Sequence, residues 1–162
     1  MNLGGGVHLT YCSNIHPGES WAEVRANLGR HVAAVRDRLM PEGDFGVGLR
    51  LSARAAAELA APAVLDEFRD FLRRSRMYVF TVNGFPYGTF HGTRVKEDVY
   101  LPDWRDAERL RYTNLLADLL SELLPADPAI EGSVSTVPGA FKPALGGPRD
   151  VATMVELLLQ HV

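Results

Sequence analysis

The stretch Met77-Tyr-Val-Phe-Thr-Val-Asn83 decides the fold of this chain, because it is short, nearly all apolar and ends in an amide side chain. Strands of parallel sheets are buried on both faces, so they appear in a sequence as near-continuous apolar runs of this kind. The stretch lies between two longer segments with helical spacing, one from Ser52 to Leu72 and one from Asp106 to Leu124. We therefore predict a parallel strand flanked by helices over residues 77–83.

The segment before this strand predicts a helical region with an interruption. Ser52 is a residue type that caps helices, and apolar residues follow it at spacings that fit the helical period. Pro62 removes a backbone donor and clashes with the preceding turn, so we expect a kink or two helices that meet there. The apolar positions of this region are Ala55, Leu59, Val64, Leu65, Phe68, Phe71 and Leu72.

Two further strands and a helix precede this region. Val7 to Cys12 and Phe45 to Leu51 are short β-prone runs. Between them, Ser20 followed by Glu23 forms a capping box, which predicts that a helix begins there. Residues spaced by three and four would place one apolar stripe on this helix, formed by Trp21, Val24, Leu28, Val32, Val35 and Leu39.

The same order of elements continues toward the carboxyl end of the chain. The helix of residues 106–124 is followed by a fourth strand, Ser133 to Val137, and by a last helix that begins near Pro148. On residues 106–124 we expect Leu110, Leu116, Leu120 and Leu123 to face inward. On the last helix the expected apolar stripe consists of Val151, Met154, Val155, Leu158 and Val162.

Four strand–helix units in a row predict an α/β protein with a parallel sheet and helical cover. An open sheet that binds a dinucleotide would carry G-x-G-x-x-G after its first strand, whereas this turn reads Ser13-Asn-Ile-His-Pro-Gly18. We therefore favour a (βα)8 TIM barrel over an open doubly wound sheet. Because a full barrel takes about 250 residues, the 162 residues predict one partial domain, half of such a barrel.

Composition narrows the class of protein further. The chain is 46% hydrophobic and 23% charged, with a net charge of −3 and no run of basic residues, so we expect no nucleic-acid partner. No apolar run reaches the length of about 20 residues that spans a bilayer, and the start has no signal-peptide pattern. A single cysteine fits a reducing compartment. We therefore expect a cytoplasmic domain without a membrane span.

Polar side chains follow each of the four predicted strands, where ligands of parallel βα arrays collect. We predict that they line a binding site for a small-molecule metabolite. These candidate substrate-binding residues are Asn14, His16, Arg50, Asn83, Tyr87, His91 and Lys142. The sequence assigns no catalytic residue, and two histidines without a carboxylate at fixed spacing specify no metal.

Several of these residues allow a structural interpretation as well. Arg50 ends an otherwise apolar strand, so it either forms an ion pair with Glu19 or Glu97 or anchors an anionic ligand. His16 is either a ligand-binding side chain or a plain loop histidine before Pro-Gly. Gly46 and Gly48 alternate along the second strand, which leaves room for a bulky group to pack close.

Five segments of the sequence are similar to a known family, the EboE-type metabolite traffic proteins. The similarity covers the chain from about Leu9 to its end. The segments that carry it are Leu9–Trp21, Gly48–Ser52, Asn83–Gly92, Val95–Arg105 and Ser133–Lys142.

The resemblance implies a xylose isomerase-like barrel, related to sugar isomerases and epimerases, with a role in the transport of a secondary-metabolite precursor. Members of the family are more than twice as long as this chain. In the wider superfamily the ligands of a divalent metal come mostly from later strands, so the resemblance implies no cofactor in this chain and a possible metal only in a full-length relative.

Three interpretations remain open at this stage. The chain could bind and escort a metabolite without catalysis, it could belong to a metal-dependent sugar or sugar-phosphate isomerase or epimerase, or it could be an inactive, truncated half-barrel. A half-barrel leaves the outer edges of its first and last strands unpaired, and unpaired edges promote association. We therefore also expect a homodimer formed through the sheet edges.

Overall fold

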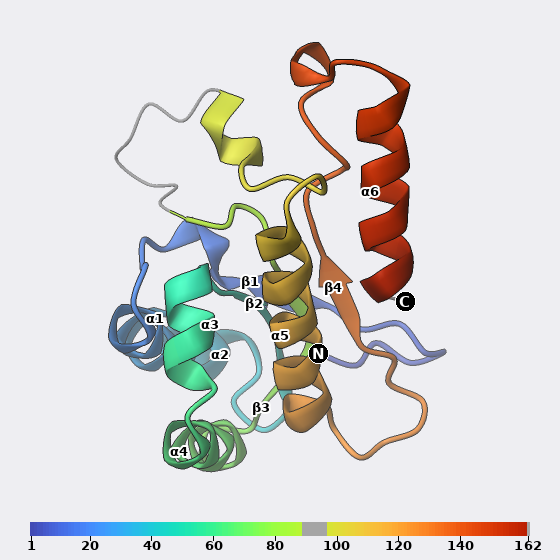
Figure 1. Cartoon of the computed structure of the whole chain (residues 1–162). Coiled ribbons are helices and arrows are strands. Elements are labelled where there is room, and N and C mark those ends of the chain that lie inside the picture. Colours follow the sequence, from blue (N-terminus) through green and yellow to red (C-terminus); the bar gives the residue numbers. More distant parts are fainter. Residues whose placement is uncertain (89–96, 162) are drawn as a thin grey trace.

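The computed structural model describes residues 1–88 and 97–161, and all structural statements below refer to these residues. They form a four-stranded parallel sheet with the strand order β1-β2-β3-β4 (Figure 1). The order equals the order along the chain, as it does in a (βα)8 barrel. The strands are β1 (Thr10–Cys12), β2 (Phe45–Arg50), β3 (Met77–Asn83) and β4 (Ser133–Ser135).

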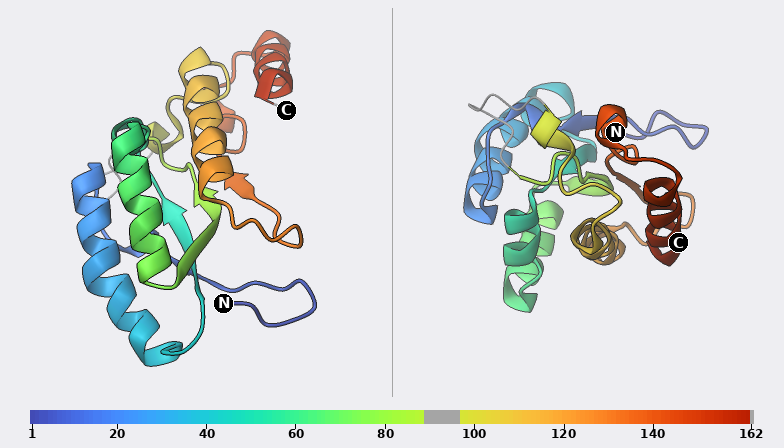
Figure 2. Two further views of the ribbon diagram at one scale, coloured as in Figure 1. Left: turned by 90° about the horizontal axis from the view of Figure 1, so that it is seen from below. Right: turned by 45° about the horizontal axis from the view of Figure 1, so that its top comes forward.

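Helices alternate with these strands, and those that follow β1, β2 and β3 line up side by side in one layer (Figure 2). They cover one face of the sheet, and no described helix covers the other. The helices are α1 (Trp21–Asn27), α2 (Ala33–Leu39), α3 (Ala53–Leu59), α4 (Pro62–Arg74), α5 (Ala107–Leu123) and α6 (Pro148–His161). Short turns are η1 (Ser13–Ile15), η2 (Leu28–Val32), η3 (Glu97–Tyr100) and η4 (Lys142–Ala144).

The helix boundaries follow the local signals in the sequence. Ser20 and Glu23 form the predicted capping box at the start of α1, with both reciprocal hydrogen bonds present. Ser52 accepts a hydrogen bond from the Ala55 amide and caps α3. Pro62 is the first residue of α4, so the predicted interruption consists of two separate helices.

The first helix departs from its predicted stripe at its far end. Trp21, Val24, Leu28 and Val32 are buried, but Leu39 is 64% exposed. The reason is η2, a π-helical turn that places one extra residue between α1 and α2. The extra residue rotates everything after it around the helix axis, so Met40 packs against the core and the prediction for Leu39 is wrong.

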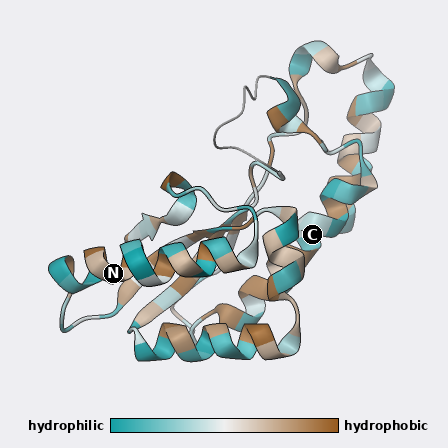
Figure 3. Cartoon of the chain, turned by 90° about the vertical axis from the view of Figure 1, so that its left-hand side faces the viewer, coloured by the Kyte–Doolittle hydropathy of each residue, from teal (hydrophilic) through white to brown (hydrophobic). Residues whose placement is uncertain are grey.

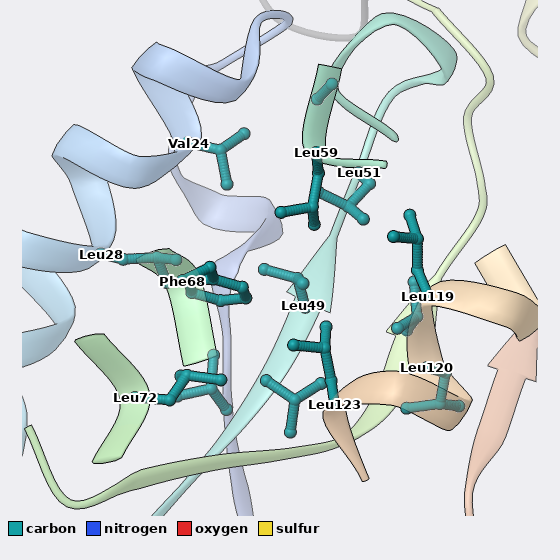
Figure 4. Close-up of a cluster of buried hydrophobic side chains, with 14 of the residues drawn as sticks. Val24, Leu28, Leu49, Leu51, Leu59, Phe68, Leu72, Leu119, Leu120 and Leu123 are labelled. Atoms are coloured by element: carbon teal, nitrogen blue, oxygen red, sulfur yellow. The ribbon is translucent and has the colours of Figure 1, made fainter. Parts of the chain in front are cut away.

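The core lies between the sheet and the layer of helices (Figure 4). Along β2, Phe45, Val47 and Leu49 point into this core and are fully buried. Because side chains alternate between the faces of a strand, the residues between them belong to the other face. These are Gly46, Gly48 and Arg50, and together with their neighbours on β1, β3 and β4 they form what we call the open face of the sheet.

Both outer strands are shorter than predicted. Residues 7–9 pair back onto residues 1–3, with hydrogen bonds from the Leu3 amide to the Val7 carbonyl and from the Leu9 amide to the Met1 carbonyl, so β1 starts only at Thr10. At the other edge, β4 ends at Ser135 and Val137 turns away. The Val137 carbonyl accepts a hydrogen bond from the Trp104 indole, and both side chains are buried in a second, smaller cluster with Met154.

The last unit packs loosely. Met154 is the only buried residue of α6 among those described. Figure 3 shows hydrophobic positions spread along this helix, and Val151, Val155 and Leu158 of the predicted stripe are 47%, 49% and 36% exposed. The predicted stripe of α6 therefore exists, but most of it faces outward.

The fold is α/β with a parallel sheet and alternating strands and helices, and this arrangement is compatible with half of a βα barrel. Each outer strand pairs with one other described strand, which leaves the second edge of β1 and of β4 without a partner within residues 1–88 and 97–161. None of the described helices is long and apolar enough to cross a membrane.

Candidate functional site

Three of the predicted site residues come from strands whose carboxyl ends meet at one edge of the sheet. In the sheet register, Arg50 lies beside Asn83, and Asn83 lies beside Ser135. Asn14 follows β1 at the same edge, in the turn η1. The parallel arrangement therefore brings the ends of all four strands to one side of the molecule, as the sequence predicts.

The Arg50 side chain joins the loops that follow β1 and β3. It is 4% exposed. Its Nη1 donates to the Gly18 carbonyl at 2.7 Å and to the Glu19 carboxylate at 3.0 Å, and its Nη2 donates to the Gly88 carbonyl at 2.7 Å. The predicted ion pair with Glu19 is thus present. Arg50 holds the edge together, and most of its donors are already used.

Ser13 and Ser52 complete the connections of this edge. The Ser13 hydroxyl accepts a hydrogen bond from the Arg50 amide at 2.9 Å, and the Ser52 hydroxyl donates to the Glu19 carbonyl at 2.6 Å. From the sequence, Ser13 was not singled out, and Ser52 was predicted only as a helix cap. A buried hydroxyl needs a partner, but the sequence gives no signal that identifies the partner across the loops.

Asn83 shapes the turn after β3. Its Oδ1 accepts hydrogen bonds from the Phe85 amide at 3.0 Å and from the Ser135 hydroxyl at 3.1 Å. Two residues earlier on the same two strands, the hydroxyls of Thr81 and Ser133 are 2.9 Å apart. Cross-strand pairs of small polar side chains therefore line the open face between β3 and β4.

His16 is packed between two other rings. Its Nε2 lies 2.9 Å from the Tyr11 hydroxyl. Its ring stacks on His31 with a centroid distance of 4.7 Å, and on Tyr11 at 5.9 Å. Asn14 lies two residues before it and is half-buried.

Tyr87 lies on the side of the helices rather than over the open face. Its hydroxyl donates to the Glu108 carboxylate at 2.8 Å, and its ring meets Tyr112 edge-on at 5.0 Å. Burial raises the pKa of the Tyr87 phenol, and the hydrogen bond to Glu108 raises it further. Tyr87 therefore lines a groove between α3 and α5, and in this structure its phenol is not presented to a ligand on the sheet.

The other two predicted residues lie farther out or outside the described part. Lys142 is exposed on η4, in the long connection between β4 and α6. His91 falls outside the described residues, so its placement is not assigned.

A buried arginine, Arg109, is the main feature of this edge that the sequence did not reveal. Its Nε donates to the Pro102 carbonyl at 2.7 Å and its Nη1 to the Gly84 carbonyl at 2.9 Å. The side chain is 0% exposed, and burial lowers the pKa of its guanidinium. Arg109 thus fixes both ends of the long connection after β3. On a helix, its spacing alone predicts only an ordinary polar position.

The open face next to this edge has a shallow floor at Gly48. A side chain at this position would lie 3.2 Å from the Thr10 hydroxyl, 3.5 Å from the Cys12 sulfur and 3.5 Å from the Thr81 methyl. The contact at 3.2 Å is tighter than most real Cβ contacts and would require a small shift of the Thr10 hydroxyl, whereas the two contacts at 3.5 Å are ordinary. Glycine therefore keeps the floor low between these neighbours, although its backbone does not require glycine. At Gly46, in contrast, the backbone of Met1 and Leu9 occupies the space, so the chain itself fills the room predicted there.

Within residues 1–88 and 97–161, no three His, Cys, Asp or Glu side chains lie together where they could hold a metal ion. What this edge offers is a small polar surface on rigid strands.

No family model, no curated protein and no solved structure matches this chain. The class that the fold and the site define is therefore an α/β protein with a parallel sheet and a polar carboxyl edge.

Proposed function

We propose that this chain is one half of a xylose isomerase-like barrel of the EboE-type metabolite traffic class, and that it binds a small polar metabolite on the open face of the sheet. The floor at Gly48 carries the proposal. It is bordered by the Thr10 hydroxyl and the Cys12 thiol of β1 and by the Thr81 methyl of β3, and it lies two residues before Arg50 on the same face of β2. Ligands of parallel βα proteins bind beyond the carboxyl ends of the strands.

The chemistry of the floor indicates the kind of ligand. Hydroxyls of Thr10, Thr81 and Ser133 both donate and accept hydrogen bonds, which suits a polyhydroxylated molecule. Arg50 lies at the same edge, and within the described residues its one ion pair is with Glu19. The edge therefore also suits a ligand with an anionic group, such as a phosphate.

A titration with two probes tests this proposal. D-ribose 5-phosphate represents a phosphorylated polyol and D-xylose a neutral one, and binding is measured by isothermal titration calorimetry. We expect the phosphorylated probe to bind more tightly. Gly48→Val fills the floor with a residue that suits a strand and should weaken binding at least tenfold.

Gly29→Ala is the matched control, because it changes a glycine on the exposed surface of η2. It should leave the affinity unchanged, and the melting temperatures of both variants show whether they fold. Failure of both probes to bind the wild-type chain contradicts a polyol site here. Equal affinity of Gly48→Val and wild type contradicts its position on the open face.

We further propose that two copies pair through the outer edges of β1 and β4, so that each completes the sheet of the other. The support is the pair of strand edges that have no partner among residues 1–88 and 97–161. Multi-angle light scattering across a range of concentrations should give the mass of a dimer. A monodisperse monomer with a cooperative melt contradicts this pairing.

A further inference from the structure

A large cavity among the described residues lies at the amino edge of the sheet, at the opposite end from the candidate site. Its volume is about 580 Å³, within the range of about 300–1,000 Å³ that is typical of small-molecule sites. It lies where α2 and α4 end and where β2 and β3 begin. Its lining includes Met40, Asp44, Leu72, Arg76, Met77 and Ile130.

Much of the wall is apolar. Leu72 and Met77 are 6% and 5% exposed, and Met40 packs against the same core. The Tyr78 hydroxyl lies 2.9 Å from His8 Nδ1, so its polar atom already has a partner. The wall therefore suits an alkyl chain, and methionine side chains adapt readily to such a chain.

Arg76, at the rim of this cavity, has an unusual backbone. Its φ is +48°, in the left-handed region, and it is the only non-glycine residue with positive φ among those described. It ends α4 at the position where glycine is preferred, because glycine has no Cβ to crowd the backbone. A non-glycine residue in this conformation is strained, because its Cβ crowds the backbone. An arginine therefore stands at the rim of the cavity although its backbone conformation is unfavourable for a residue with a side chain.

Among the charged side chains around the cavity, the Arg76 guanidinium has the longest contact with its partner. Arg73 pairs with Asp70 at 2.7 Å, and the Asp127 carboxylate accepts the Ala129 amide of its own turn at 3.0 Å. Arg76 contacts Asp44 at 3.3 Å, which is long for a charge-assisted hydrogen bond. A second carboxylate can therefore approach Arg76 and form the shorter contact.

We propose that this cavity binds an amphipathic carboxylate, with the carboxylate on Arg76 and the alkyl chain along Met40, Leu72 and Met77. The site is distinct from the open face, and it does not depend on the function proposed above. The two ends of the sheet would then hold ligands of different polarity.

Decanoate is the probe, and binding to the whole chain is measured by isothermal titration calorimetry. Arg76→Gly removes the guanidinium and relieves the backbone, so its melting temperature should equal or exceed that of the wild type. Its affinity for decanoate should fall about tenfold, since a hydrogen bond between charged groups is stronger than one between neutral groups. Greater stability with weaker binding is a combination that a purely structural Arg76 does not give.

Decanol, which has the same chain without the charge, should bind more weakly than decanoate and should be unaffected by Arg76→Gly. Ile130→Trp should block the cavity and weaken both. Arg149→Ala, on the exposed start of α6, is the matched control for loss of an arginine and should change nothing. Unchanged decanoate affinity in Arg76→Gly, or loss of binding on Val155→Ser in α6 instead, overturns the proposal.

Discussion

The middle of the sheet and its last unit are built from the same kind of sequence but pack very differently. All six residues of β2 are buried, and α5 buries seven of its residues. β4 has three residues, none of them buried, and α6 buries only Met154. Both α5 and α6 carry an apolar stripe, so the difference does not lie in their amphipathic pattern.

The difference lies in their neighbours. α5 contacts α3, α6, β3 and β4, whereas the main helix contact of α6 is α5 alone. A helix in a βα array buries its stripe only when the sheet and helices on both sides are in place. The stripe of α6 therefore stays exposed because this helix has a described neighbour on one side, whereas α5 has neighbours on both sides.

The largest expected effect separates the two regions directly. Leu49→Ala removes a fully buried side chain from the centre of β2 and should lower the free energy of unfolding by about 3 kcal/mol. Val155→Ala on α6, where the side chain is 49% exposed, should cost less than about 0.5 kcal/mol. Urea unfolding followed by circular dichroism measures both.

Equal losses at the two positions contradict the comparison, because they mean that α6 is buried in solution. A partner that covers α6 produces this result, and the loss at Val155 then depends on protein concentration. The same titration at two concentrations distinguishes the cases.

Polar side chains should also contribute more to stability in the middle of the sheet than in the last unit. Arg50→Met removes three hydrogen bonds that join the loops after β1 and β3, and we expect a loss of about 2 kcal/mol. Lys142→Met removes a charge from the exposed turn after β4 and should stay within about 0.5 kcal/mol. Thermal unfolding of both variants checks this, and an equal loss at Lys142 shows that the outer connection is as tightly held.

Hydroxyl side chains on α1 and α6 should show a smaller difference in their contribution to stability. Ser20→Ala removes the side chain that accepts the Glu23 amide at the start of α1 and should cost about 1 kcal/mol. Thr153→Ala on α6 removes a hydroxyl that bonds back to the Arg149 carbonyl, and such bonds do not stabilise helices. Chemical unfolding should show a loss for Ser20→Ala alone, and a similar loss in both variants contradicts the assignment of Ser20 as the cap.

The smallest expected effect is a dependence on pH. Hydrogen bonds from the Ser20 and Glu19 amides hold the pKa of Glu23 at about 2, below its usual value of 4.5. A lowered pKa in the folded state stabilises the protein above pH 4.5, and this contribution is lost as the pH falls toward 2. Glu23→Gln should flatten the stability profile in this window.

Glu156→Gln on the exposed surface of α6 removes one carboxylate without touching a cap and serves as the control. The melting temperature between pH 5 and 2 should respond only to the first substitution. An unchanged slope in Glu23→Gln contradicts the pKa given for this carboxylate.

The order and type of the elements could be predicted from the sequence because the signals are local. Met77–Asn83 is observed as predicted, and Ser20, Ser52 and Pro62 mark helix starts where expected. The ends of β1 and β4 could not be predicted, because they depend on contacts between distant residues, such as the bond from Trp104 to Val137. The exposure of α6 could not be predicted for the same reason, since the apolar stripe of a helix does not show which other element covers it.

The candidate site could be predicted only as a set of strand ends. Arg50, Asn83 and the turn with Asn14 lie at one edge because parallel strands place them there. Tyr87 turned toward Glu108 instead, and the role of Arg109 depends on the path of a loop. Directions of loop side chains come from long-range contacts, which the spacing of residues does not contain.

The π-helical turn at Leu28–Val32 has a practical consequence for sequence comparison. A regular helix of the same length from another protein would superpose on α1 but would be out of step by one residue along α2. An alignment without a gap would then match Leu39, which is exposed, to a core position, and would miss Met40. A one-residue gap between Leu28 and Val32 restores the correspondence, so searches for distant relatives should allow an insertion there.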